Sequence, residues 1–98
     1  MKAGKWHPVA ERLSRWARIR LLEILLDELE QKEIAKACDT SEQAVSNWIH
    51  KETHHPSDKN AVVLLDMAWQ RDRDRTRAIL RTEAERYLKE LRELGIRP

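Results

Sequence analysis

Residues 31–50 constrain the fold of this chain more than any other stretch, because their apolar side chains recur only where two short crossed helices would touch. The inner face of the first helix would consist of Ile34, Ala35 and Cys38. The inner face of the second would consist of Ala44, Val45, Trp48 and Ile49. The pattern predicts one helix from residue 31 to residue 37 or 38, a turn at 39–40, and a second helix capped by Ser41, whose hydroxyl can accept from the amides after it.

The outer face of the second predicted helix is polar. Its side chains are Glu42, Gln43, Ser46, Asn47 and His50. This division is typical of a helix-turn-helix, in which one helix lies over the DNA backbone and the next enters the major groove. Amide side chains match the donor and acceptor of adenine, and a glutamate can accept from cytosine N4. We therefore expect the last four residues to face bases and Glu42 to lie at the groove entrance.

Residues 20–68 resemble the DNA-binding domain of the phage-repressor (Cro/C1, or Xre) family. The resemblance is carried by Gln31-Lys-Glu-Ile-Ala through His50, and by Pro56-Ser57 followed by Val-Val-Leu-Leu-x-Met-Ala. It implies base contacts on the outer face of the second helix and a phosphate contact at Gln31, near free amides at a helix start. The family usually has glycine where Asp39 stands, because the backbone there is left-handed; aspartate tolerates that conformation at modest cost. Response-regulator and sigma-factor helix-turn-helices share the Lys-Glu-Ile-Ala opening.

The positive charge is unevenly distributed. Residues 1–20 carry six basic side chains and one acidic, whereas residues 31–60 carry four lysines and five acids. Much of the attraction for phosphates is therefore expected from the arginine-rich start. Arg12, Arg15 and Arg18 would line a strip of phosphates or pair with acids of residues 23–30 or of the Arg/Asp run at 71–77; the sequence leaves both open. The expected DNA contacts are Gln31, Ser41, Glu42, Gln43, Ser46, Asn47, His50, Lys51, Lys36 and Arg15, with Lys59 as a further candidate.

The rest of the chain predicts more helices. One would begin at Pro8, where a missing N–H costs nothing, and end near residue 27 or 28. Another would follow the cap Ser57, with apolar side chains up to Ala68. The alternating Arg/Asp run is expected to be solvated, and a C-terminal amphipathic helix would follow it and stop at Gly95 in a Schellman motif. The expected units are therefore residues 1–68, for DNA binding, and residues 69–98, for packing or dimerisation.

The C-terminal helix carries an apolar seam with 4-3-4-3 spacing. Its members are Leu80, Ala84, Tyr87, Leu91 and Leu94. Such a seam packs on another helix, either the first helix of the same chain or a twofold mate. Because proteins that read operators are usually twofold dimers, we favour a homodimer through this helix.

The amino-acid composition narrows the fold class and the possible functions further. Two glycines, three prolines and no β-branched runs predict an all-α fold of about five helices. The 37% charged residues and the lack of an apolar run predict no membrane span, and the N-terminus lacks the apolar centre of a signal peptide, so a cytoplasmic location is expected. Neither a nucleophile–histidine set nor a glycine-rich phosphate loop is present, so we expect no enzyme and no cofactor.

Several single residues attract a functional interpretation. His50, His54 and His55 offer too few convergent ligands for zinc, so we expect no metal and interpret the loop after residue 50 as solvated or as a wing that contacts phosphate. Cys38 is expected to be a buried, inert thiol, and Trp48 a core residue. The remaining tryptophans, Trp6, Trp16 and Trp69, would form an aromatic contact between the first helix and the tail, or a dimer interface.

These observations predict sequence-specific binding of double-stranded DNA by a small dimeric transcriptional regulator, most simply a repressor of phage, plasmid or antitoxin type. Two alternatives stay open at this stage. One is a centromere-binding (segregation) or DNA-packaging adaptor that assembles on repeated sites through the tail. The other is a helical protein-interaction module that does not bind DNA, consistent with the mildly acidic charge of residues 31–60.

Overall fold

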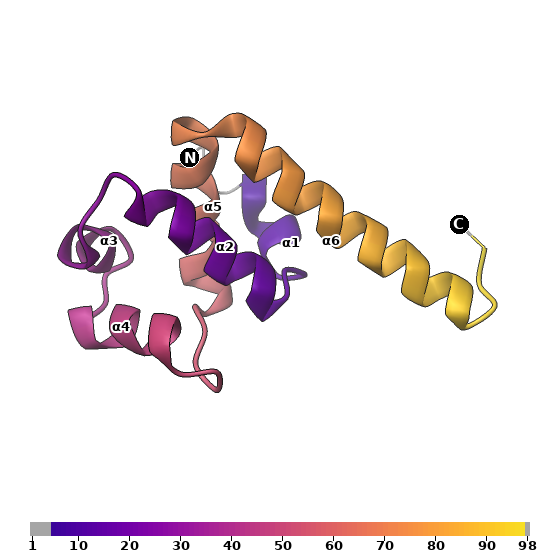
Figure 1. The fold of residues 1–98 in the computed structure, drawn as a ribbon, viewed down its shortest axis with the longest axis horizontal. Helices are drawn as coiled ribbons and strands as arrows, with labels where there is room; N and C mark the ends of the chain where they lie inside the picture. Colours follow the sequence, from indigo (N-terminus) through magenta and orange to yellow (C-terminus); the bar gives the residue numbers. More distant parts are fainter. Residues whose placement is uncertain (1–4, 98) are drawn as a thin grey trace.

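A computed structural model of the protein describes residues 5–97, which form six helices and no strand. The helices are α1 (His7–Ala10), α2 (Arg15–Leu26), α3 (Gln31–Ala37), α4 (Glu42–His50), α5 (Asp58–Arg71) and α6 (Arg73–Glu93). Helices α2 and α5 pack together at the centre, α1 packs on α5, and α6 packs on both central helices (Figure 1). The all-α class predicted from the sequence is confirmed. Lys2 of the basic N-terminal segment and Pro98 lie outside the described residues.

The core is formed mainly by aliphatic side chains of α2 and α5. The largest fully buried aliphatic side chains are Leu21, Leu22, Leu25, Ile34, Val45, Leu64 and Leu65. Each contributes roughly 1.5–3 kcal/mol relative to an exposed side chain. Trp48 and Cys38 are buried in the same cluster, as predicted. Burial raises the pKa of the Cys38 thiol to about 11, so the reactive thiolate is scarce near neutral pH.

The expected single helix from Pro8 to residue 27 or 28 is wrong, because the chain breaks between α1 and α2. Ser14 has an extended backbone (φ −69°, ψ 167°), and its hydroxyl accepts a hydrogen bond from the N–H of Ala17. A new helix therefore starts at Arg15. The apolar spacing concealed this break because Leu13 remains buried on the core side while the backbone around it turns. The decisive signal was the cap at Ser14.

The expected boundary after Ala68 is also displaced. Helix α5 continues to Arg71, and Asp72 separates it from α6, with its carboxylate accepting from the N–H of Arg75. The Arg/Asp run is only partly solvated. Thr76 within it is fully buried, with its hydroxyl bonded to the carbonyl of Asp72 at 2.8 Å. Arginines of this run also pair with acids at the end of α2, as Arg75 does with Asp27.

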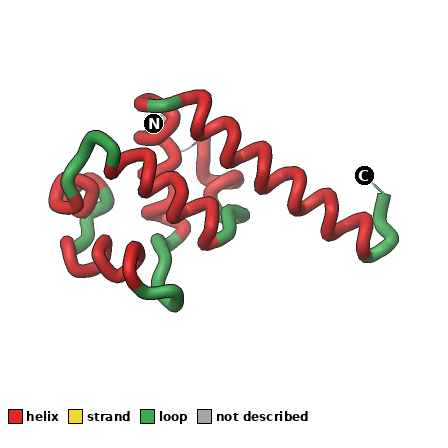
Figure 2. The backbone as a smooth tube through the Cα atoms, in the orientation of Figure 1, coloured by secondary structure: helices red, strands yellow, loops and turns green. Residues whose placement is uncertain are grey.

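The end of α6 has the predicted Schellman geometry. Gly95 has φ +81°, and its N–H donates to the carbonyl of Arg92 at 2.9 Å. The N–H of Ile96 donates to the carbonyl of Leu91 at 2.8 Å, which satisfies one of the free carbonyls at the helix end. Figure 2 shows the chain turning back at this point, far from the other helices.

The predicted aromatic contact at the N-terminus is present in part. The rings of Trp6 and Trp69 lie with centroids 5.3 Å apart and planes inclined by 59°, and the indole N–H of Trp6 donates to Asp66 at 3.1 Å. Trp16 is separate from this pair. The guanidinium groups of Arg20 and Arg86 approach its ring at 5.7 and 4.7 Å, so it joins α2 to α6 instead.

Candidate nucleic-acid interface

Helices α3 and α4 are joined by a turn whose backbone ends α3 sharply. The N–H of Thr40 donates to the carbonyl of Ala35 at 2.9 Å, and the N–H of Asp39 donates to that of Lys36 at 3.2 Å. This is the Schellman pattern, with Asp39 in the left-handed region at φ +53°. Ser41 then caps α4 as predicted, because its hydroxyl accepts from the N–H of Ala44 at 3.0 Å. The turn thus starts the second helix in a new direction: Figure 1 shows α3 nearly end-on and α4 across the view.

The predicted inner faces of α3 and α4 pack on the core, although Ala44 and Ile49 of α4 are only half-buried. Ile34 and Ala35 of α3 and Val45 and Trp48 of α4 belong to the main core. Helix α4 is therefore held by one side, and its opposite side is free of the core. This arrangement positions the polar residues of α4 on the outside of the molecule, next to the turn and the loop at 51–57.

The outer side chains of α4 form two pairs, each linking residues one helical turn apart. The amide nitrogen of Gln43 donates to the amide oxygen of Asn47 at 3.0 Å. Nδ1 of His50 lies 3.2 Å from the hydroxyl of Ser46 and 2.9 Å from its carbonyl. Each pair restricts the rotamers of both members and so reduces the conformational entropy that binding would cost.

The first pair leaves complementary hydrogen-bonding groups available. Because the side-chain nitrogen of Gln43 donates to the side-chain oxygen of Asn47, the side-chain oxygen of Gln43 and the side-chain N–H groups of Asn47 have no hydrogen bond within residues 5–97. One acceptor and one donor side by side match N6 and N7 of adenine in the major groove. Chemically, the outer face of α4 can read an A·T pair.

The other predicted contacts lie around α4 rather than on its outer face. Gln31 and Lys36 belong to α3, which packs on α4, and Lys51 is the exposed residue at the C-terminal end of α4. Glu42 is exposed in the first turn of α4. The structure thus brings the predicted residues other than Arg15 onto one helix-turn-helix unit. Their contacts with DNA stay predictions.

Arg15 supports the C-terminal end of α4. Its Nε donates to the carbonyl of His54 at 3.1 Å, and its Nη2 donates to the carbonyls of Trp48 and Lys51, both at 3.2 Å. One side chain of α2 therefore satisfies three carbonyls where α4 ends and the loop begins. No sequence pattern indicated this positioning role, because the three acceptors are main-chain atoms. A phosphate contact by the same guanidinium stays a prediction.

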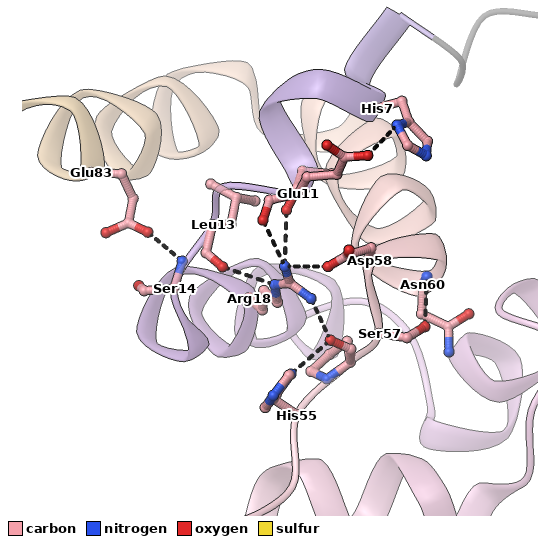
Figure 3. A network of polar contacts seen from close by, with 12 residues as sticks. His7, Glu11, Leu13, Ser14, Arg18, His55, Ser57, Asp58, Asn60 and Glu83 are labelled. Carbon is pink, nitrogen blue, oxygen red and sulfur yellow. Dashed lines mark hydrogen bonds and ion pairs between the residues drawn. The ribbon is translucent and has the colours of Figure 1, made fainter. Parts of the chain in front are cut away.

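Arg18 does not lie on a phosphate strip, contrary to one of the two interpretations of the arginine spacing. It is only 4% exposed, and its guanidinium donates to the carbonyls of Leu13 (3.0 Å), Pro56 (2.7 Å) and Ala10 (3.1 Å). Figure 3 shows the guanidinium of Arg18 between Leu13 and Asp58. Its acidic partner is Asp58 at 2.8 Å, so the pairing expected with residues 23–30 or with the Arg/Asp run is also wrong. The side chain joins the turn before α2, the loop before α5 and the start of α5.

The histidines after α4 lie singly along the loop. Nδ1 of His54 contacts the hydroxyl of Thr53 at 3.0 Å, and Nδ1 of His55 contacts the carbonyl of Pro56 at 2.9 Å. Within the part of the chain that the structure describes, no three side chains of His, Cys, Asp or Glu gather as a metal site would require. The loop residues 51–55 are exposed.

No protein-family model, curated protein or solved structure matches this chain significantly. The resemblance to the phage-repressor family therefore rests on the residues quoted above. The structure defines the chain as a small all-α protein in which two short helices, α3 and α4, are joined by a tight turn at one side of a core formed by α2 and α5. None of the helices in residues 5–97 has the length and apolar character needed to cross a bilayer.

Proposed function

We propose that this protein binds double-stranded DNA in a sequence-specific way, with α4 in the major groove. The observation that carries the proposal is the outer face of α4: four polar side chains, prearranged in two hydrogen-bonded pairs, on a helix whose other side is fixed in the core. In the proposed setting the protein is a cytoplasmic dimeric transcriptional regulator of phage, plasmid or antitoxin type, resembling the Cro/C1 family, and not an enzyme. A repressor acts most simply by occupying an operator that polymerase needs.

The distribution of charge predicts how this binding depends on salt. Arg18 is buried on carbonyls and Asp58, and Arg15 is half-buried with Nε and Nη2 on main-chain carbonyls, so the exposed cations next to α4 are chiefly Lys36 and Lys51, with Lys59 in the first turn of α5. Binding that neutralises about two to four phosphates per copy gives a shallow salt dependence. Affinity would then depend more on base contacts than on the phosphate backbone.

Selection of bound duplexes from a random pool at about 0.15 M salt tests the proposal. The matched control is the Gln43→Ala/Asn47→Ala double variant, which removes the proposed base contacts and leaves the core unchanged. The expected result is an enriched inverted repeat for the natural chain and none for the variant. Enrichment of tandem direct repeats would instead support the segregation or packaging adaptor. No enrichment, together with no binding at low salt, would overturn DNA binding and leave the interaction module.

A further inference from the structure

Helix α6 extends beyond α2 and α5, the two helices on which it packs (Figure 1). Its first turns are anchored through the buried Thr76 and Ile79, and Figure 1 shows its C-terminal half projecting away from all other helices. The face that is buried near the start continues along the projecting half. There it carries exposed apolar side chains: Tyr87 is 61% exposed, Leu94 76% and Ile96 50%. Leu80 is the seam residue that packs on the main core. Within residues 5–97, the seam residues after Leu80 belong to no core cluster.

A groove lies at the base of the projecting half. Its walls are α1 with the turn after it on one side and the middle of α6 on the other. The apolar residues that line it are Pro8, Val9, Leu13, Leu80, Ala84 and Tyr87. Val9 in its wall is 39% exposed. The groove and the apolar tip of α6 are thus two separate apolar surfaces on one chain.

The exposed area is larger than a monomer of this size normally has. The accessible surface is 6681 Å², whereas a folded monomer of 11.6 kDa is expected to expose about 5,800 Å². The shape agrees, since the radius of gyration is 13.9 Å against about 12.6 Å expected for a compact chain of this length.

We propose that the occupant of this groove is a second copy of the chain, whose α6 runs antiparallel to the first and inserts its tip. Two copies would exchange tips about a twofold axis, so each groove is filled and each tip is covered in one closed assembly. The inference deepens the dimer of the proposed function by naming its surface and direction. It does not require DNA binding.

The sizes of the side chains favour the antiparallel direction. Antiparallel pairing of the seam sets Ala84 against Leu94 of the second copy and Tyr87 against its Leu91. The smallest seam residue then meets the tip, where the groove has room for a bulky side chain. Parallel pairing would set Ala84 against Ala84 and leave both grooves unfilled, which forfeits dispersion contacts along their apolar walls.

Charge complementarity supports the same direction. Arg12 lines the groove, is exposed, and has no ion-pair partner among the described residues. Glu90 lies on the projecting half of α6, on the same face as Tyr87 and Leu94, and is likewise unpaired there. Insertion of the tip brings Glu90 of the second copy to the side of the groove where Arg12 lies. Glu83, which also lines the groove, is paired with Arg86 and accepts from the N–H of Ser14, so Arg12 is the charge there that lacks a partner.

Sedimentation equilibrium of the natural chain without DNA tests the assembly. A monomer–dimer equilibrium is expected. Arg12→Glu and Glu90→Arg should each weaken it at least about tenfold, because each change acts at two symmetric sites, and their combination should restore it. Lys89→Glu is the matched control, since residue 89 lies on the opposite side of α6 and should have no effect. Circular dichroism verifies that each variant remains folded.

Cysteine cross-linking tests the direction. The Ala84→Cys/Leu94→Cys variant should form intermolecular disulfides, and Leu94→Cys alone should not; the native Cys38 is buried and serves in both. A disulfide with Leu94→Cys alone would show parallel pairing and overturn the proposal. A chain that stays monomeric at all concentrations, or a dimer indifferent to both charge reversals, would also overturn it. In either case a failure to select DNA would be a separate result.

Discussion

The carboxylate of Glu83, in the middle of α6, accepts a hydrogen bond of 2.7 Å from the backbone N–H of Ser14, just before α2 (Figure 3). The amides at the start of a helix have no partner within it, so a carboxylate there is stabilised by hydrogen bonding and by the helix dipole. The side chain of Glu83 is only 14% exposed. Together with the buried Thr76 and Ile79 and the contact of Arg86 with Trp16, this hydrogen bond holds the middle of α6 against α2.

Replacing Glu83 should release the middle of α6. Glu83→Ala is expected to lower the free energy of unfolding by about 1–2 kcal/mol, because a charge-assisted hydrogen bond is lost and an amide of Ser14 loses its acceptor. Urea denaturation at concentrations where the chain is monomeric measures the change. Glu85→Ala, an exposed acid of the same helix, is the control and should change little. Equal losses from both would mean that the contact adds no stability.

Replacement of Arg18 should lower the free energy of unfolding more than replacement of most other polar residues. Arg18→Leu leaves the carbonyl of Leu13 without a donor, removes one donor each from the carbonyls of Ala10 and Pro56, and leaves Asp58 unpaired, so we expect a loss of about 3 kcal/mol or more. Asp58 itself is 59% exposed, so Asp58→Asn should cost less than about 1 kcal/mol. Thermal unfolding of the two variants provides the comparison. If the aspartate proved as important as the arginine, the ion pair rather than the main-chain bonds would stabilise this junction.

The left-handed residue between α3 and α4 offers a stabilising change. Asp39 has φ +53°, which a side chain adopts only with strain, whereas glycine adopts it freely. Asp39→Gly should raise the free energy of unfolding by about 0.5–1 kcal/mol after the greater flexibility of unfolded glycine is deducted. Asp39→Val should lower it, since a β-branched side chain tolerates this region least. Chemical denaturation is the measurement, and a gain with valine would contradict the explanation.

Base contacts and phosphate contacts can be separated on α4. Under the proposed function, Gln43→Ala and Asn47→Ala should each cost about 1–3 kcal/mol on the selected site and little on random DNA. Because the two amides are bonded to each other, their effects should not add in the double variant. Titration of labelled duplexes gives these values. Equal losses of affinity on both DNAs would show that the two amides position the protein on DNA and do not read bases.

Arg15 has an observed structural role at the end of α4 and a predicted role at phosphate, and salt dependence distinguishes the two. If Arg15→Ala only loosens the end of α4, affinity should fall while the slope of log affinity against log salt stays unchanged. If the guanidinium also contacts a phosphate, the slope should decrease by about 0.9 per copy. Lys51→Ala is the reference for a loss of charge without loss of the three carbonyl bonds. Nε and Nη2 of Arg15 are engaged by the three carbonyls, whereas Nη1 has no hydrogen bond among residues 5–97, so the predicted phosphate contact would use Nη1 and the slope should decrease.

Features with local causes were predictable from the sequence alone. The faces of α3 and α4 follow from apolar periodicity, and the starts of α4 and α5 follow from Ser41 and Ser57, whose hydroxyls bond amides three residues away. The stop at Gly95 likewise depends only on the backbone within one turn. Such signals act between neighbours, so one sequence is enough to identify them.

Tertiary structure decided what depends on atoms distant along the chain. The sequence could not show that Arg18 is buried, because its partners are carbonyls of two loops and a carboxylate 40 residues away. The break before α2 has a local cap at Ser14, and Arg18 adds a tertiary contribution by donating to the carbonyls of Ala10 and Leu13 there. The same holds for α6. Apolar periodicity predicted its seam. Only the tertiary structure shows that the helices packed on α6 end near Glu83, so that half of the seam is exposed beside a groove.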